Sequence, residues 1–139
     1  MMLPDENPYA VDSDCCYGEL HSQVRLGIEF FNAHRFFEAH EALETAWREE
    51  PGPIRDLYRG IIQVAVAYYH IQQGNNRGAL KMFYRCRRWL SKYPDHCRGI
   101  PVAQLRQDYQ LIELLVMKLR PGNSLVIPEY PFKPILLDI

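Results

Sequence analysis

The stretch from Arg35 to Trp47, RFFEAHEALETAW, has the period of an amphipathic α-helix. Glu38 falls in the first turn, where a carboxylate is favoured by the helix dipole. The PGP sequence at 51–53 follows as a stop signal, so the pattern predicts a helix over 35–50. Its apolar face is formed by Phe36, Ala39, His40, Leu43, Ala46 and Trp47.

Periodicity and helix-stop signals predict four further helices on either side of this stretch. Every connection within residues 33–76 is short, so consecutive helices should pack as antiparallel neighbours. The expected fold is all-α, a compact bundle of about five helices in antiparallel helical hairpins. The four further helices are expected over 19–32, 54–73, 77–93 and 101–120.

A weak internal repeat supports the hairpins. An offset of forty residues superposes Gly27 on Ala67 and Ala39 on Ala79. The spacing of these small residues is that of tetratricopeptide-type helix pairs, in which small side chains let two helices approach closely. Two copies are too few for a solenoid, so a compact bundle of tetratricopeptide-like hairpins is expected.

The chain of 139 residues has the length of one domain. Residues 1–17 are expected to form a loose N-terminal arm and residues 18–120 the helical domain. The tail, residues 121–139, holds four prolines and nine apolar residues after position 123. Prolines oppose a helix there, so we expect an extended proline-rich strap packed on the domain or on a partner subunit.

Composition and charge exclude several classes of protein. The formal net charge of −1 indicates no obligatory polyanionic partner, and nucleic acid is not expected. Residues 1–56 hold twelve acids and four bases, whereas residues 57–94 hold no acid and seven bases. These oppositely charged halves are expected to pair with each other, and a basic patch for an anionic partner is the alternative.

The cysteines and the hydropathy indicate a cytoplasmic protein. No CxxC pair occurs among the four cysteines, and no apolar leader precedes them, so reduced thiols in a cytoplasm are expected. The longest apolar stretch, GIIQVAVAYYHI, is too short to span a membrane.

The segment HEALE raises the question of a polar seam or a metal site. A second stripe on the helix over 35–50 carries Glu41, Glu44 and Arg48, next to the apolar face. The following helix has its polar residues, among them Arg59, Gln63 and His70, on one side. Folding the two helices antiparallel predicts a buried polar seam in which Glu44 pairs with Arg59 and Glu41 with Gln63.

The metal site is the alternative interpretation of HEALE. His40 and Glu44 are spaced i,i+4, which suits two ligands on one helix face. A zincin would need a second histidine where Glu44 stands, and His70 is expected about six residues, or ~9 Å, from the level of His40. We therefore expect no metal and no other cofactor. If a metal were bound, His40 and Glu44 would be its ligands.

A basic stripe marks the helix expected over 77–93. Its members follow one another at i, i+4, i+7 and i+11, a spacing that keeps them on one face. The stripe is either a solvated helix face or an anion-binding face for phosphates. It consists of Lys81, Arg85, Arg88 and Lys92.

These patterns together resemble the prokaryotic domain-of-unknown-function family numbered 309, over roughly residues 26–90. The shared features are the FEAHE core at 37–41, Glu44, Trp47, the GIIQ segment at 60–63, and the YH, GN and GA pairs at 69–70, 74–75 and 78–79. The chain departs from the family at His34, where members commonly have glycine. The resemblance implies an all-helical fold and no particular activity.

The leading functional hypothesis is a non-enzymatic helical scaffold or interaction module that binds an unknown protein partner or self-associates. Such a module should bury its polar seam and show an apolar surface elsewhere. The alternative is a small-molecule or metal-binding protein, a hydrolytic protein among them, with its site at HEALE. That protein should open a pocket onto the seam.

Overall fold

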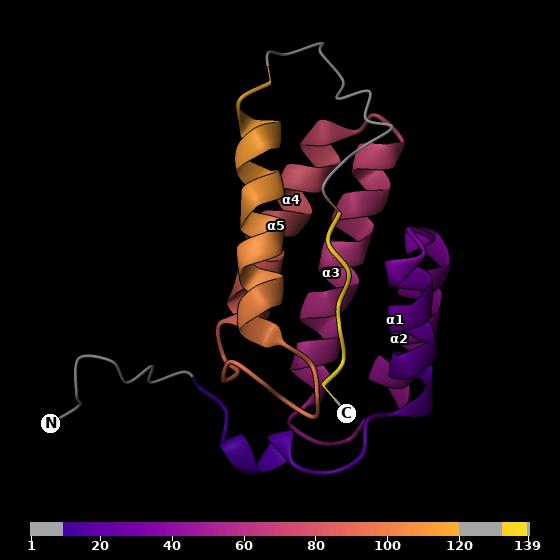
Figure 1. Ribbon diagram of the computed structural model, residues 1–139, viewed down its shortest axis with the longest axis vertical. Coiled ribbons are helices and arrows are strands. Elements are labelled where there is room, and N and C mark those ends of the chain that lie inside the picture. The colour runs from indigo at the N-terminus through magenta and orange to yellow at the C-terminus, as the bar shows by residue number, and fades with distance from the viewer. Residues whose placement is uncertain (1–9, 120–131, 139) are drawn as a thin grey trace, which may run out of the picture.

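The computed structural model describes residues 10–119 and 132–138, and within these ranges the chain is all-α (Figure 1). Each helix expected from the sequence is present. A short 3₁₀ helix, which the sequence did not indicate, precedes them. The elements are η1 (Ser13–Cys16), α1 (Ser22–Asn32), α2 (Phe36–Glu49), α3 (Arg55–Gln72), α4 (Asn76–Leu90) and α5 (Val102–Met117).

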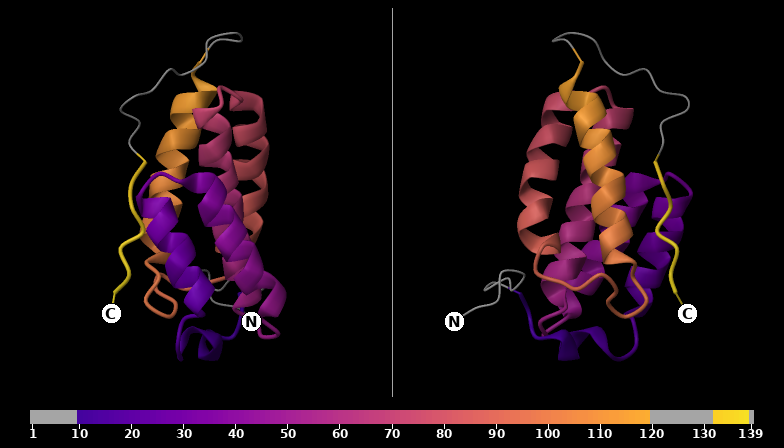
Figure 2. Two further views of the ribbon diagram at one scale, coloured as in Figure 1. Left: turned by 90° about the vertical axis from the view of Figure 1, so that its right-hand side faces the viewer. Right: turned by 60° about the vertical axis from the view of Figure 1, so that its left-hand side comes forward.

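Helices that follow one another in the chain pack side by side, α1 on α2, α2 on α3, α3 on α4 and α4 on α5. The α1–α2 hairpin lies on one flank of α3, and α4 and α5 lie on the other (Figures 1 and 2). This arrangement confirms the compact bundle of antiparallel hairpins. The connections between α1 and α2, α2 and α3, and α3 and α4 are short, so each of these helices packs against its neighbour in the chain. The longer connection over 91–101 brings α5 back against α4.

The two hairpin turns have the same backbone geometry. His34 ends the first helix of one hairpin with φ +60°, and Gly74 ends the first helix of the other with φ +74°. In both turns the next amide bonds back across the helix end, Arg35 to the carbonyl of Phe30 and Asn75 to that of His70. The repeat of forty residues therefore extends to the turns, although a left-handed histidine is strained where glycine is not.

The small residues of the repeat lie where the helices meet. Gly27, Ala39, Ala67 and Ala79 are buried. A Cβ added to Gly27 would come 2.7 Å from Cγ of Leu43 on α2. The expected close approach is thus present in the α1–α2 hairpin, and the corresponding residues of the α3–α4 hairpin, Ala67 and Ala79, are buried.

The described part of the C-terminal tail, residues 132–138, runs as an extended strap in front of α3 (Figure 1). The ring of Phe132 lies 5.1 Å from that of Phe36 and 4.6 Å from that of Tyr68. Further along, Ile135 is buried, and the Asn32 side chain bonds both its N–H and its C=O, at 2.7 and 2.9 Å. The expected strap is confirmed for these residues, and positions 120–131 and 139 lie outside the described residues.

The N-terminal segment differs from the loose arm that was expected, as far as residues 10–17 are described. The amide of Val11 donates to the carbonyl of Lys92, and Cys16 forms a disulfide with Cys97 in the α4–α5 loop. Cys15 and Cys86 are free. The expectation of four reduced thiols is corrected for one pair, because a separation of 81 residues hides its proximity from the sequence.

The hydropathy of the helices and the exposed side chains of α5 describe the surface. Among the described residues, no helix is long and apolar enough to cross a membrane. Large apolar side chains are nevertheless exposed along α5, at Leu111, Leu114, Leu115 and Met117. An apolar surface therefore exists away from HEALE, as the interaction-module hypothesis requires.

Candidate functional site

The polar residues of HEALE lie on the surface of α2. Glu44 is 3.5 Å from the Nε2 of His40 and 3.5 Å from a guanidinium nitrogen of Arg48, and 37% of its side chain is exposed. Glu41 is exposed as well. The expected buried seam is thereby corrected: within the described residues, the partners of Glu44 come from its own helix, and neither Arg59 nor Gln63 pairs with these glutamates.

A small apolar pocket of about 170 Å³ lies next to HEALE. It is lined by Phe37 and His40 from α2 and by Tyr69 and His70 from α3, together with Phe36 and Val66. The two histidines thus border one pocket, although His70 was expected to lie too far along its helix. Burial lowers the pKa of His70, so its ring stays neutral under conditions that protonate an exposed histidine.

The pocket does not gather a set of metal ligands. The Nδ1 of His40 lies 3.0 Å from the carbonyl oxygen of Phe37, which occupies that nitrogen. In the part of the chain that the structure describes, one group of three ligand side chains lies close enough together for a metal ion: Cys15, Cys16 and Cys97. The absence of a cofactor at HEALE stays a prediction. The pocket beside His40 and His70 is the feature expected of the small-molecule alternative, so that alternative also stays a prediction.

A larger groove of about 790 Å³ lies between α3 and α4. We call it the basic groove. Gly60 lets the two helices close beside it, since a Cβ there would meet Cδ2 of Leu90 at 2.7 Å and Cβ of Trp89 at 3.3 Å. The groove is lined by Arg59 and Gln63 from α3, by Tyr84, Arg85, Arg87, Arg88 and Trp89 from α4, and by Ser91.

Two indole rings and four cations form a ladder along one side of the basic groove. The guanidinium carbon of Arg55 lies 4.0 Å from the centre of the Trp47 ring, and that of Arg59 lies 4.4 Å from the centre of the Trp89 ring. Arg88 and Lys92 each approach the Trp89 ring to 4.8 Å. Such cation–π contacts hold the guanidinium groups in place, and they leave N–H edges free for other partners. The Nε of Arg55 already donates to the carbonyl oxygen of Trp47 at 2.8 Å, so Arg59 and Arg88 are the guanidinium groups that matter for a ligand.

Several cations of the basic groove have no acidic partner. Arg87 pairs with Glu113 of α5, and Lys92 lies 3.3 Å from Asp56. No carboxylate of residues 10–119 or 132–138 pairs with Arg59, Arg85 or Arg88. The expected pairing of the acidic and basic halves is therefore incomplete. Three of the cations without a carboxylate partner among the described residues, Arg59, Arg85 and Arg88, line the groove, whereas Arg77 and Lys81 lie outside it.

Two buried polar atoms beside these cations also have no partner among the described residues. They are the Oε1 of Gln63, which lines the groove, and the Nε1 of Trp47, which belongs to the ladder. A buried polar atom without a hydrogen bond costs about 1–3 kcal/mol. Groups that a ligand or water can satisfy are common in binding sites.

The groove includes part of the basic stripe expected from the sequence. Arg85 and Arg88 line the groove. Lys92 contacts the ring of Trp89, which is a lining residue, and Lys81 is exposed outside the groove. Sequence analysis missed the two tryptophans as partners of the cations. Gly60 was the available sequence signal for this contact. A glycine inside a helix, here directly after Arg59, often marks a point where a neighbouring helix comes close.

The fold and this groove define a class of protein: a small helical protein built from two helical hairpins and a fifth helix. Within it, residues 24–82 match the family described as Domain of unknown function (DUF309), which confirms the resemblance noted from the sequence. The match covers most of α1, all of α2 and α3, and about the first half of α4, so Trp89 and Arg88 lie beyond it.

Two curated relatives share part of this region. The chain is 43% identical over 56 residues to the uncharacterized protein YpuF of Bacillus subtilis (strain 168), an alignment that covers 40% of this chain and 32% of the relative. It is 31% identical over 80 residues to an uncharacterized protein of Aquifex aeolicus (strain VF5), covering 55% of this chain and 23% of the relative. The chain thus spans a third or less of the length of the curated relatives it matches.

Proposed function

We propose that this chain is a non-catalytic interaction module that binds an acidic segment of a partner protein in the basic groove. The observation that carries the proposal is a set of guanidinium groups in the groove that have no carboxylate partner among the described residues. Arg59 and Arg88 lie over the Trp89 ring, and Arg85 lines the same groove. A guanidinium held against an indole has lost much of its freedom before a ligand arrives. It therefore pays less entropy when it takes a carboxylate in a bidentate hydrogen bond.

The state of the tryptophans favours an acidic protein segment over a nucleic acid. Proteins that bind single strands stack bases on free aromatic rings. Here cations already lie over both rings, at 4.0 Å for Trp47 and 4.4 Å for Trp89. Because cations cover the rings, a ligand contacts the N–H groups along the guanidinium edges, and these bind carboxylates.

Cytoplasmic location and a protein partner remain expectations within this proposal. The exposed apolar side chains of α5, at Leu111, Leu114, Leu115 and Met117, supply a second surface with which a partner or another copy could associate. The exposed apolar surface of α5 does not indicate which kind of partner it binds. The positive charge of the basic groove indicates an acidic partner. The groove is accordingly the site to test.

The test is titration of the purified chain with a short glutamate-rich peptide, followed by calorimetry and by the fluorescence of the two tryptophans. Replacing Arg85 and Arg88 together by Gln should weaken binding by about tenfold or more, since hydrogen bonds to charged groups contribute roughly 1.5–3 kcal/mol each. Affinity should fall as salt is added.

The matched control is the double replacement of Arg77 and Lys81 by Gln on the same helix. It removes the same charge from exposed positions outside the groove lining and should leave the affinity nearly unchanged. Equal weakening by both pairs would show a general charge effect and contradict the groove. Tighter binding of a single-stranded oligonucleotide of equal charge would contradict an acidic protein segment as the ligand and would favour a nucleic acid.

A further inference from the structure

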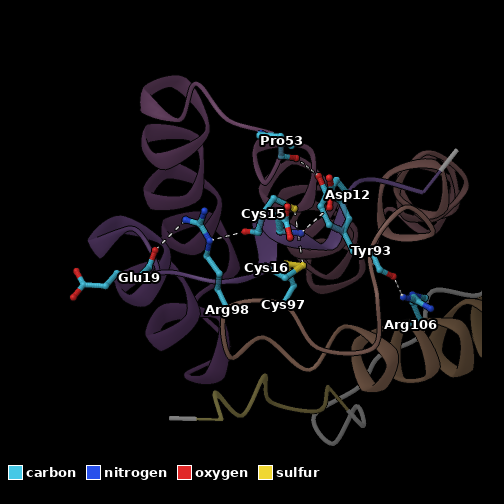
Figure 3. The surroundings of a disulfide bond; sticks show 10 residues. Asp12, Cys15, Cys16, Glu19, Pro53, Tyr93, Cys97, Arg98 and Arg106 are labelled. Atoms are coloured by element: carbon cyan, nitrogen blue, oxygen red, sulfur yellow. Dashed lines mark hydrogen bonds between the residues drawn. A yellow bond between two sulfur atoms is a disulfide. The ribbon is translucent and has the colours of Figure 1, made fainter.

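Three sulfur atoms meet where η1 lies against the α4–α5 loop (Figure 3). Cys16 and Cys97 form the disulfide, and the Sγ of Cys15 lies 4.0 Å from that of Cys16. All three sulfur atoms lie within 4.8 Å of one another. Cys97 is buried, while Cys15 and Cys16 are partly buried, so the cluster can be reached from solvent.

Hydrogen bonds hold the two segments together independently of the disulfide. The backbone N–H of Arg98 donates to the carbonyl of Cys16 at 2.9 Å, and its Nε donates to the carbonyl of Cys15 at 2.8 Å (Figure 3). Its Nη1 reaches the carbonyl of Glu19 at 3.0 Å. When the disulfide is open, these contacts keep the three sulfurs near one another.

The spacing suits one metal ion. Three thiolates arranged in a plane around an ion at about 2.3 Å, the usual zinc–sulfur distance, are ~4.0 Å apart. Cys15 and Cys16 already have that separation. Reduction would let the sulfur of Cys97 move away from that of Cys16 to a similar distance.

We propose that the reduced form of this chain binds one thiophilic cation through Cys15, Cys16 and Cys97. Soft thiolate ligands select Cu(I) and zinc, and three thiolates satisfy Cu(I) without a further ligand. The site is separate from HEALE, where no metal is expected, and it does not depend on the basic groove.

Formation of the site is chemically balanced with a dithiol as reductant. The reductant gives two electrons and two protons to the Cys16–Cys97 bond and becomes a disulfide itself. The sulfur–sulfur bond breaks to give two thiols. Binding of the cation then displaces the thiol protons to solvent. In a reducing compartment the ion replaces the disulfide as the covalent link between residues 10–19 and the loop that carries Cys97.

The test uses the full chain, reduced with a dithiol that is then removed, and titrated with Cu(I) against a competing chelator. We expect one Cu(I) per chain, a thiolate-to-copper absorption band and a higher melting temperature of the reduced protein. The oxidised protein should bind no copper at this site. A parallel titration with Zn²⁺ shows which cation the three thiolates prefer.

Cys15→Ser is the decisive variant, because Cys15 takes no part in the disulfide. Loss of this ligand should weaken Cu(I) binding by more than about a hundredfold, since even partners outside the ligand shell contribute 10–100-fold. The matched control is Cys86→Ala, which removes the other free thiol, buried in α4. It should keep full binding.

Three outcomes would overturn the proposal. The first is undiminished copper binding by Cys15→Ser, and the second is equal loss in Cys86→Ala. Far-UV circular dichroism supplies the third: a chain that unfolds on reduction and does not regain its helices with Cu(I) has no such site. Recovery of the helices with Cu(I) would support it.

Discussion

The guanidinium carbon of Arg59 lies 4.4 Å from the centre of the Trp89 ring and 5.7 Å from that of Trp47. Arg59 therefore bridges two aromatic rings on neighbouring helices instead of neutralising a carboxylate of α2. This contact joins α2, α3 and α4 at one level of the bundle. It leaves the outer edge of the guanidinium open to a ligand.

The first prediction follows from the separate surroundings of Glu44 and Arg59. Glu44→Ala removes an exposed carboxylate bonded within α2, so the free energy of unfolding should change by no more than about 0.5–1 kcal/mol. Combining it with Arg59→Ala should give additive effects, because the two residues share no contact. Chemical denaturation of the four proteins in this cycle provides the measurement. A coupling energy above about 1 kcal/mol would contradict this prediction and would indicate a direct interaction between Glu44 and Arg59.

The second prediction concerns the closest approach of α3 and α4. Gly60→Ala would place a Cβ 2.7 Å from Cδ2 of Leu90, and this overpacking should lower the free energy of unfolding by about 1–3 kcal/mol. Helix propensity alone would change it by about 1 kcal/mol in the opposite direction. In a Leu90→Ala background, where the two nearest atoms are absent and Cβ of Trp89 at 3.3 Å remains, Gly60→Ala should cost less. An equal cost in both backgrounds would argue against the clash.

The third prediction tests the C-terminal strap. Asn32→Ala removes both hydrogen bonds to Ile135 and should lower the free energy of unfolding by about 1–3 kcal/mol. Arg25→Ala, an exposed change on the same helix, is the control and should stay within about 0.5 kcal/mol. Deleting residues 124–139 should lower the melting temperature further. In the truncated chain Asn32→Ala should have no additional effect, and a persisting effect would place its role elsewhere.

The fourth prediction is a pH dependence of stability from His70. Burial lowers the pKa of His70 in the folded chain, so between the unfolded value of about 6.5 and the lower folded value the unfolded chain binds more protons. Stability is therefore complete above the unfolded pKa and falls as the pH drops through this window. His70→Gln should flatten the loss of unfolding free energy between neutral and mildly acidic pH. An unchanged slope in His70→Gln, measured by chemical denaturation across this pH range, would contradict the prediction.

Most of the helical architecture could be predicted from the sequence, because its signals are local. A period of 3.6 residues, the PGP stop and the glycine at 74 each act over a few residues, and they placed the helices near their observed bounds. The forty-residue repeat even aligned His34 with Gly74, the two left-handed turn residues. The C-terminal strap could be predicted because its prolines exclude a helix and its apolar side chains favour burial against the domain.

The candidate site could be predicted only in part, because a helical wheel states which residues share a face but not which neighbour that face meets. Arg85 and Arg88 were found as a stripe, whereas their relation to Trp89 and Arg59 depends on how α3 and α4 rotate about their axes. The same rotation leaves Glu44 beside Arg48 and away from Arg59.

By itself, then, the sequence determined the all-α class, the paired hairpins and the packed strap, since each follows from interactions between residues near one another in the chain or from a simple need for burial. The tertiary structure alone decided the disulfide between Cys16 and Cys97, the basic groove and the surface position of HEALE. These features join residues distant in the sequence, and the rotation and register that unite them are set by the packing of the whole core.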